Sequence, residues 1–402
     1  MNSDRPIASR SGTVAAPDRA NLGSSRPVSR NPVLDGLRFL AAALIVLYHY
    51  QSEGPWPLSR LSPVFLRGYL ATDFFLILSG YVLGRAYGPK LAARRVSDER
   101  FLWRRILRVW PAHLAMLAAF VILVAVVAPA NPERFRWSDL PAQALLVHAW
   151  GLNTGAGWNL PTWSLSALIV CYAAFPSLWR GLSRIRSGLL LFAAGLALIW
   201  GADQLSRALF HEDLYDLRFS LGVFRALPLF IFGAGVARIG ELRRAGERGA
   251  ALVLLAAGAA VTLLQTVGRF DLVSMALLGV VIGAAGAIRT TRGARIAGQA
   301  AQLSFALYIT HIFVAAIWFH VTRLAVQRFH LGEGLQWAAW GLSLPAALAT
   351  AMAFERFVDR PLQAVCARYL DRAPGRAAIL APERLKLTPF GKTRGSAPPA
   401  PG

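Results

Sequence analysis

Long apolar stretches recur along most of this 402-residue chain. A stretch of about 17 to 25 apolar residues, wound as a helix, is long enough to cross a hydrocarbon core of about 30 Å. The composition agrees, because 55% of the residues are hydrophobic and only 16% are charged. We therefore expect an all-α fold, a polytopic membrane helix bundle with no large soluble domain beside it.

About ten transmembrane helices are predicted from these stretches. Their approximate ranges are 35–52, 69–87, 107–128, 159–179, 187–202, 220–239, 250–267, 271–288, 303–322 and 335–357. A shorter apolar piece, residues 140–150, suits a re-entrant or interfacial segment better than a full span. If that piece does not cross, the number of spans is even and both ends of the chain lie on one side of the membrane.

Arginine is distributed unevenly between the segments that connect the spans. With the N-terminus inside, each of the first five inner segments holds three to seven basic residues, and each outer loop holds one or two. This is the positive-inside pattern, so the N- and C-termini are predicted to be cytoplasmic. The net charge of +22 then reflects membrane topology, and no nucleic-acid partner is expected.

Polar and basic sequence flanks the apolar region on both sides. Residues 1–33 and 366–402 are predicted to be disordered basic cytoplasmic tails, and residues 34–365 the transmembrane domain. The first tail contains no apolar stretch, so it lacks the pattern of a cleavable signal. Cys171 and Cys366 lie far apart with no partner spacing, and neither a disulfide nor a metal site is predicted.

Ionisable residues inside a bilayer cost at least ~2.5 kcal/mol on insertion scales, so each one needs a partner or a function. In the first span, Arg38 and His49 are eleven residues apart, which places them on one helix face about 16 Å from each other. Glu53 follows His49 at i+4 and either orients the imidazole or is a solvated loop residue. A lone histidine in a membrane helix is as often a satisfied core residue as a functional one.

Further charged residues lie at the start of the next two spans. Asp73 is expected to pair with Arg38 or another buried cation, because an unpaired carboxylate there would tend to become neutral. Arg104, Arg105 and Arg108 begin the third span, and guanidinium forks suit phosphate oxygens. The alternative interpretation of these arginines is a positive-inside anchor that binds lipid head groups.

Six sequence motifs follow one another between about residues 33 and 365. They are LDGLRFLAAALIVLYHY with Arg38 and His49, ATDFFLILSGYVL with Asp73, Ser79 and Gly80, FLWRRILRVWP with Arg105, Arg108 and Pro111, WSLSALIVCYAAFP with Trp163, Ser164 and Tyr172, SFALYITH with Ser304, Tyr308 and His311, and FVDRPL with Phe357, Asp359 and Pro361. In these motifs the chain resembles acyltransferase family 3, the bacterial multi-pass membrane O-acyltransferases that act on glycans and related acceptors. Ser79 and Gly80 are expected to permit close helix approach, and nucleophilic action by Ser79 is the less favoured alternative.

Two positions depart from the pattern of that family. Leu168 stands where the family usually has Glu, and Asp359 stands where Glu is usual. Asp359 keeps the charge, whereas Leu168 removes it. The loss indicates either a divergent acceptor site or an acid that only positions its neighbours in relatives.

The resemblance implies a multi-pass O-acyltransferase of the bacterial inner membrane. An acyl group, most often acetyl, would pass from cytoplasmic acyl-CoA to a hydroxyl of a carbohydrate or glycolipid acceptor presented from the outer side. Acyl-CoA is then a co-substrate, and no permanently bound cofactor is expected. His49 is the predicted general base, because imidazole titrates at roughly pH 6.5. A covalent acyl-histidine intermediate is the alternative.

The predicted site has three parts. The catalytic residues are His49, Arg38, Asp73 and Glu53. The donor-binding residues are Arg38, Arg104, Arg105 and Arg108. The residues predicted to line the acceptor path are Trp163, Ser164, Tyr308 and His311, whose alternative role is interhelical hydrogen bonding.

A transporter or flippase is the main competing function, since buried Arg, His and Asp in a multi-pass bundle also serve proton or substrate movement. Two observations argue against a transporter. The sequence shows no visible inverted repeat, and the ionisable residues are concentrated in the first three spans. A sensor or scaffold would leave the face shared by Arg38 and His49 unexplained. The sequence specifies neither the acceptor nor an oligomeric state.

Overall fold

The computed structural model describes residues 31–127, 135–152, 158–217, 220–242, 246–268 and 270–372. Every regular element in this part of the chain is a helix. The two predicted tails lie almost entirely outside the described residues, which begin at Asn31 and end at Arg372.

The α-helices of the described residues follow the apolar stretches closely. They are α1 (Pro32–Tyr50), α2 (Leu70–Ala92), α3 (Asp98–Val127), α4 (Leu140–Ala144), α5 (Trp163–Leu182), α6 (Gly188–Phe210), α7 (Gly222–Leu242), α8 (Glu247–Val267), α9 (Asp271–Ala287), α10 (Ala294–Phe329), α11 (Glu333–Phe354) and α12 (Arg360–Arg372). A π-helical turn, Glu355–Asp359, joins α11 to α12. Each of the ten predicted spans overlaps one helix, α1 to α3 and α5 to α11.

Eight helical segments of the described chain are long and apolar enough to cross a membrane. Of the other two predicted spans, α9 is apolar but has 17 residues, and α2 carries Asp73, Arg85 and Lys90. The five-residue α4 is too short to cross, in agreement with the interpretation of residues 140–150. The protein is therefore an all-α polytopic helix bundle.

The most extensive helix packing joins α2 to α7. Gly80 of α2 lies so close to α7 that a Cβ atom would clash with the Phe230 carbonyl oxygen, and a Cβ atom on Gly233 would clash with the carbonyl oxygen of Ile77. Small residues permit this approach between membrane helices, so the predicted packing role of Gly80 is confirmed. Because α2 also contacts α1, α5 and α9, Asp73 and Thr72 on α2 are buried against protein.

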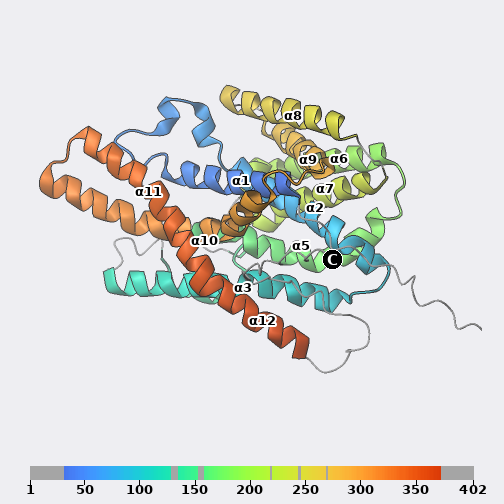
Figure 1. Cartoon of the computed structure of the whole chain (residues 1–402), viewed down its shortest axis with the longest axis horizontal. Coiled ribbons are helices and arrows are strands. Elements are labelled where there is room, and N and C mark those ends of the chain that lie inside the picture. Colours follow the sequence, from blue (N-terminus) through green and yellow to red (C-terminus); the bar gives the residue numbers. More distant parts are fainter. Residues whose placement is uncertain are drawn as a thin grey trace, which may run out of the picture. The chain divides into compact units, whose positions relative to one another are not determined.

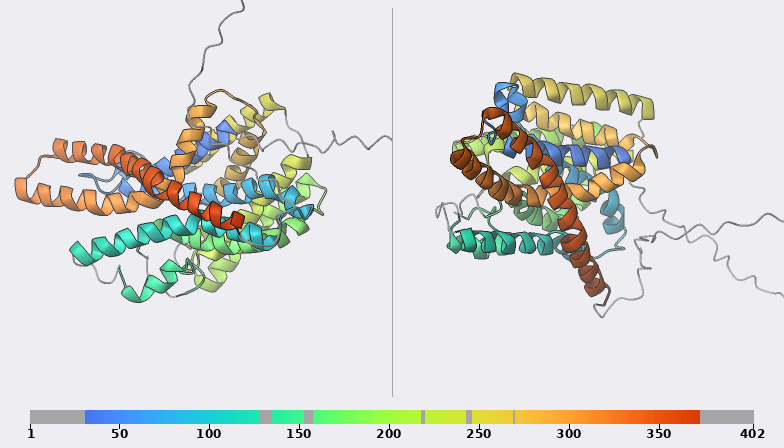
Figure 2. Two further views of the ribbon diagram at one scale, coloured as in Figure 1. Left: turned by 60° about the horizontal axis from the view of Figure 1, so that its bottom comes forward. Right: turned by 60° about the vertical axis from the view of Figure 1, so that its left-hand side comes forward.

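α10 and α11 form a long hairpin, which the orange and red-orange ribbons of Figures 1 and 2 show, and α1 packs along α10. Trp318 of α10 donates to the Ala339 carbonyl of α11 at 2.9 Å, and Trp340 of α11 donates to the Tyr50 carbonyl of α1 at 2.8 Å. The Tyr50 hydroxyl donates to the His311 carbonyl at 2.7 Å. These bonds hold the end of α1 against the middle of α10.

α12 packs across α3 (Figure 1). Pro111 of α3 has no N–H group to donate to the Leu107 carbonyl one turn earlier. The Gln363 side chain of α12 donates to that carbonyl at 3.3 Å and to the Arg108 carbonyl at 3.0 Å. The tail predicted from residue 366 therefore begins with helix, which continues to Arg372 because α12 has α3 to pack against.

Candidate active site

A cavity of about 320 Å³ lies beside the end of α1. Its walls come from α1, α2, α5, α7, α10 and the segments that precede α2 and α5. The lining residues with polar or aromatic groups are Tyr48, His49, Gln51, Ser52, Tyr69, Thr72, Trp163, Arg225 and Tyr308. Helices that are distant in sequence thus meet at one polar pocket, and three of its residues, His49, Trp163 and Tyr308, belong to the predicted site.

His49 and His311 face each other where α1 packs on α10. The Nε2 atom of His311 lies 3.1 Å from the Nδ1 atom of His49, and the ring centroids are 5.0 Å apart. Each Nδ1 also contacts a carbonyl oxygen one turn earlier in its own helix, that of Ile45 at 3.0 Å for His49 and that of Leu307 at 3.2 Å for His311. His311 is fully buried, whereas His49 is half-buried and lines the cavity. A molecule in the cavity can therefore reach His49.

Tyr308 connects α10 to the start of α5. Its hydroxyl donates to the Pro161 carbonyl and contacts the Ser164 Oγ, both at 2.7 Å. Interhelical hydrogen bonding, the alternative role considered for this group, is thus present. Tyr308 and Trp163 also line the cavity, so they are placed where an acceptor could touch them.

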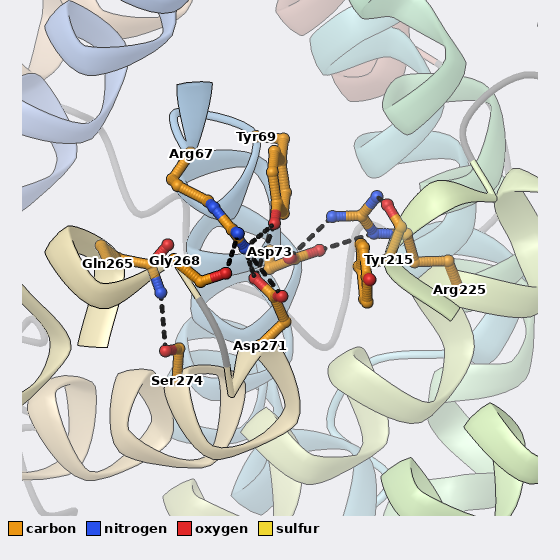
Figure 3. Close-up of polar contacts among 9 residues, drawn as sticks. All are labelled: Arg67, Tyr69, Asp73, Tyr215, Arg225, Gln265, Gly268, Asp271 and Ser274. Atoms are coloured by element: carbon orange, nitrogen blue, oxygen red, sulfur yellow. Dashed lines mark hydrogen bonds and ion pairs between the residues drawn. The ribbon is translucent and has the colours of Figure 1, made fainter. Parts of the chain in front are cut away.

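Asp73 and Arg225 form a fully buried ion pair beside the cavity (Figure 3). The Nε and Nη2 atoms of Arg225 donate to the two carboxylate oxygens at 2.8 and 2.7 Å, and Nη1 donates to the Tyr215 carbonyl. Both side chains have 0% exposure. The buried cation that Asp73 was expected to meet is therefore Arg225, held in the bidentate geometry that suits a guanidinium and a carboxylate.

A second charged cluster lies next to this pair (Figure 3). Arg67 donates to both oxygens of Asp271 at 3.1 and 2.9 Å and also to the Gly268 carbonyl, while the Tyr69 hydroxyl donates to Asp271 at 2.6 Å. Burial, and then the bond to Asp271, raise the pKa of the Tyr69 hydroxyl above its ordinary value. Tyr69 therefore stays protonated and fixes the segment before α2 to the start of α9.

The arginines of α3 lie elsewhere, near the ends of α2 and α12. Arg105 donates to the Tyr87 hydroxyl at 2.8 Å, and its guanidinium lies 4.7 Å from the centroid of that ring. Arg108 donates to the Asp359 carboxylate at 3.0 and 3.2 Å and lies 4.8 Å from the Phe305 ring centroid. The Arg108 side chain keeps 41% exposure, so it can still meet a ligand.

The predicted residues therefore lie mainly in two places, the cavity beside the end of α1 and the arginine group of α3. The remaining ones lie outside the cavity. Arg38 lies about two helical turns along α1 from Ile45, which lines the cavity, and about three turns from His49, with a side chain that is 38% exposed. Arg104 is half-buried on α3 beside Arg105. Glu53 forms an ion pair with Arg323 at 2.9 Å.

Six of the nine polar or aromatic lining residues were not predicted, and Arg225 is the charged one among them. Arg225 lies within the predicted span 220–239, where an ionisable residue is itself a signal of a partner or a function. Leu168, where the family usually has Glu, is buried in the apolar core, so this chain has no charge to satisfy there.

The bundle of membrane-crossing helices encloses a cavity in which an imidazole is accessible, an arrangement compatible with catalysis inside the membrane. The family model described as an acyltransferase domain matches residues 31–356, and the chain belongs to this family, acyltransferase family 3. The protein is therefore a membrane acyltransferase.

Similarity to individual proteins agrees with the family assignment. The chain is 28% identical over 380 residues to acyltransferase MdmB of Streptomyces mycarofaciens, an alignment that covers 86% of this chain and 94% of the relative. It is 31% identical over 196 residues to Protein 2 in picA locus of Rhizobium radiobacter, covering 44% of this chain and 96% of that relative. No solved structure matches the chain.

Proposed function

We propose that this protein transfers an acyl group, in the simplest case acetyl, from cytoplasmic acyl-CoA to a hydroxyl of a carbohydrate or glycolipid acceptor at the outer face of a bacterial inner membrane. His49 is the general base of this reaction. The observation that carries the proposal is the position of His49 in a polar cavity inside the bundle of a membrane acyltransferase.

The chemistry requires one base that later acts as an acid. As the acceptor oxygen attacks the thioester carbonyl carbon, His49 takes the proton of the hydroxyl. The carbon–sulfur bond then breaks, and the same proton passes to the leaving thiolate, so that the products are an ester and free CoA. An imidazole suits both steps because its pKa of roughly 6.5 lies near the working pH.

The cavity favours a small part of an acceptor. Its volume of about 320 Å³ is at the lower end of the roughly 300 to 1,000 Å³ usual for small-molecule sites. Tyr69, Trp163 and Tyr308 line it with rings that have both an apolar face and a polar atom. These dimensions suit one sugar-sized group of the acceptor. The rest of a larger acceptor molecule would then lie outside the cavity.

The donor is proposed to bind at the arginines of α3. Arg105 and Arg108, together with Arg104 and Arg38, provide guanidinium groups for the phosphates of CoA. Phe305, which lies against Arg108, is six residues before His311 in α10, a rise of about 9 Å. An extended thiol arm running along α10 would then bring the thioester to His49. The positive-inside pattern of the sequence supports a cytoplasmic position for this arginine group.

The test is acyl transfer by purified protein in liposomes, with radiolabelled acetyl-CoA and crude envelope glycans as acceptor. We expect His49→Gln to reduce transfer by about 10²- to 10⁴-fold, the usual contribution of general base catalysis. His320→Gln is the matched control, because His320 is exposed on α10. A folded His49→Gln protein with unchanged transfer would refute the assignment of the base.

A further inference from the structure

His311 makes contacts that a place on the acceptor path does not explain. It is fully buried, and among the described residues the cavity is lined by His49 and Tyr308 rather than by His311. Its Nε2 atom instead approaches the Nδ1 atom of His49 at 3.1 Å. Its backbone is held by the bond from the Tyr50 hydroxyl. The ring therefore has one fixed position against His49.

The contacts of the two rings determine where their protons lie. A carbonyl oxygen can only accept, so the Nδ1 atom of His311 that contacts the Leu307 carbonyl carries a hydrogen. A neutral His311 then presents a lone pair at Nε2. The Nδ1 atom of His49 contacts both this lone pair and the Ile45 carbonyl. Because both of these groups are acceptors, His49 carries its hydrogen at Nδ1 and its lone pair at Nε2.

We infer that His311 is a positioning residue, which accepts the hydrogen bond from Nδ1–H of His49 and fixes the tautomer in which Nε2 of His49 is the base. This inference rests on the proposed role of His49 in acyl transfer. When Nε2 takes the proton of the acceptor hydroxyl, the imidazolium that forms already has its Nδ1–H bonded to His311 and Ile45. The developing positive charge therefore meets acceptors that need no reorientation.

An imidazole differs from the carboxylate that orients the histidine in Ser-His-Asp sites. A carboxylate at the buried position of His311 would itself need a cation, because a buried charge is costly unless it is paired. The neutral His311 ring provides the acceptor without that requirement. It thus orients His49 inside the bundle without adding a net charge.

The tautomer can be measured without reference to activity. Full-length protein labelled with ¹⁵N-histidine, in lipid bilayers at about pH 8 where imidazole is neutral, gives solid-state NMR signals that distinguish protonated from unprotonated ring nitrogens. The spectra of His49→Gln and His311→Gln assign the two rings. We expect a protonated Nδ1 and an unprotonated Nε2 for His49, with through-space coupling between its Nδ1 and the Nε2 of His311. A His49 ring protonated at Nε2 overturns the inference.

Kinetics provide a second measurement. His311→Leu removes the acceptor and is expected to lower kcat about 100-fold, the effect of a misplacement of about 1 Å, with an unchanged KM for acetyl-CoA. His311→Gln keeps an acceptor oxygen and is expected to recover part of that loss. An equal loss in both variants with unchanged thermal stability, or an effect confined to KM, contradicts a positioning role.

The two proposals can fail separately. If His311→Leu does not fold, the NMR spectra of the wild type and the kcat of His311→Gln decide the inference. If His49→Gln transfers acyl groups normally, the proposed function fails, while the NMR experiment still reports the tautomer. His320→Gln serves as the control in both measurements because it removes an exposed histidine from the same helix as His311.

Discussion

Replacing Asp73 by asparagine tests the buried ion pair beside the cavity. The change removes the negative charge and nearly preserves the size of the side chain. Arg225 then loses the carboxylate that accepts its hydrogen bonds at 2.8 and 2.7 Å. Because both side chains have 0% exposure, water cannot take the place of the missing charge.

The structure gives the expected magnitude. Asparagine keeps one acceptor oxygen, so the change removes one of the two charged hydrogen bonds, worth about 1.5 to 3 kcal/mol, and weakens the other. Removing one partner of a buried ion pair costs about 3 to 5 kcal/mol, because the other charge stays buried and uncompensated. We therefore expect Asp73→Asn to lower the free energy of unfolding by about 3 to 5 kcal/mol.

An exposed ion pair of the same protein is the matched control. Asp98 and Arg180 pair with side chains that are 47% and 49% exposed, so Asp98→Asn should change stability by at most ~1 kcal/mol. The double variant Asp73→Leu with Arg225→Met removes both buried charges and should recover much of the stability lost in Asp73→Asn.

Unfolding in mixed micelles of increasing SDS content, followed by circular dichroism, measures these differences, and acyl transfer is assayed on the same samples. Two results would refute the reasoning. One is an Asp73→Asn protein no less stable than Asp98→Asn. The other is a double variant as unstable as Asp73→Asn alone.

Three further changes have defined outcomes. Gly80→Ala should sharply lower the unfolding temperature, because its Cβ would clash with a backbone carbonyl of α7, whereas Gly258→Ala, with open space around it, should be neutral or slightly stabilising. Arg108→Gln should raise the KM for acetyl-CoA about tenfold with little change in kcat, since it removes one charged contact to phosphate; an unchanged KM would argue against the donor site. Gln363→Leu should cost about 1 kcal/mol in SDS unfolding, because the Leu107 carbonyl loses its donor; a variant as stable as wild type would show that this bond does not matter.

The positions of the helices could be predicted because apolar length directly reports what must cross a bilayer. Their ends could not. α3 begins at Asp98 rather than at residue 107, since its first turns are too polar to register as apolar although they are helical. α10 runs from Ala294 to Phe329, well beyond the predicted 303–322, because the turns at both ends carry residues such as Arg295, Arg323 and Arg328 and do not register as apolar although they are helical.

The site was partly predictable for a similar reason. His49 is visible in the sequence as an ionisable residue in an apolar span, but its contact with His311 joins residues 262 positions apart and depends on tertiary packing. Glu53 shows the opposite case. The i+4 spacing suggested a contact with His49, yet α1 ends at Tyr50, so helical spacing no longer applies and Glu53 pairs with Arg323.

The contact between α3 and α12 has a consequence for the order in which the protein is made. Arg108 receives its carboxylate from Asp359, which follows it by 251 residues, and the Leu107 carbonyl receives its donor from Gln363. The ribosome therefore completes α3 long before it synthesises Asp359 and Gln363, the residues that contact the arginine-containing part of α3. Under the proposed function, a nascent chain already holds the charges for acyl-CoA but cannot arrange them, and the donor site becomes complete only when α12 has been made.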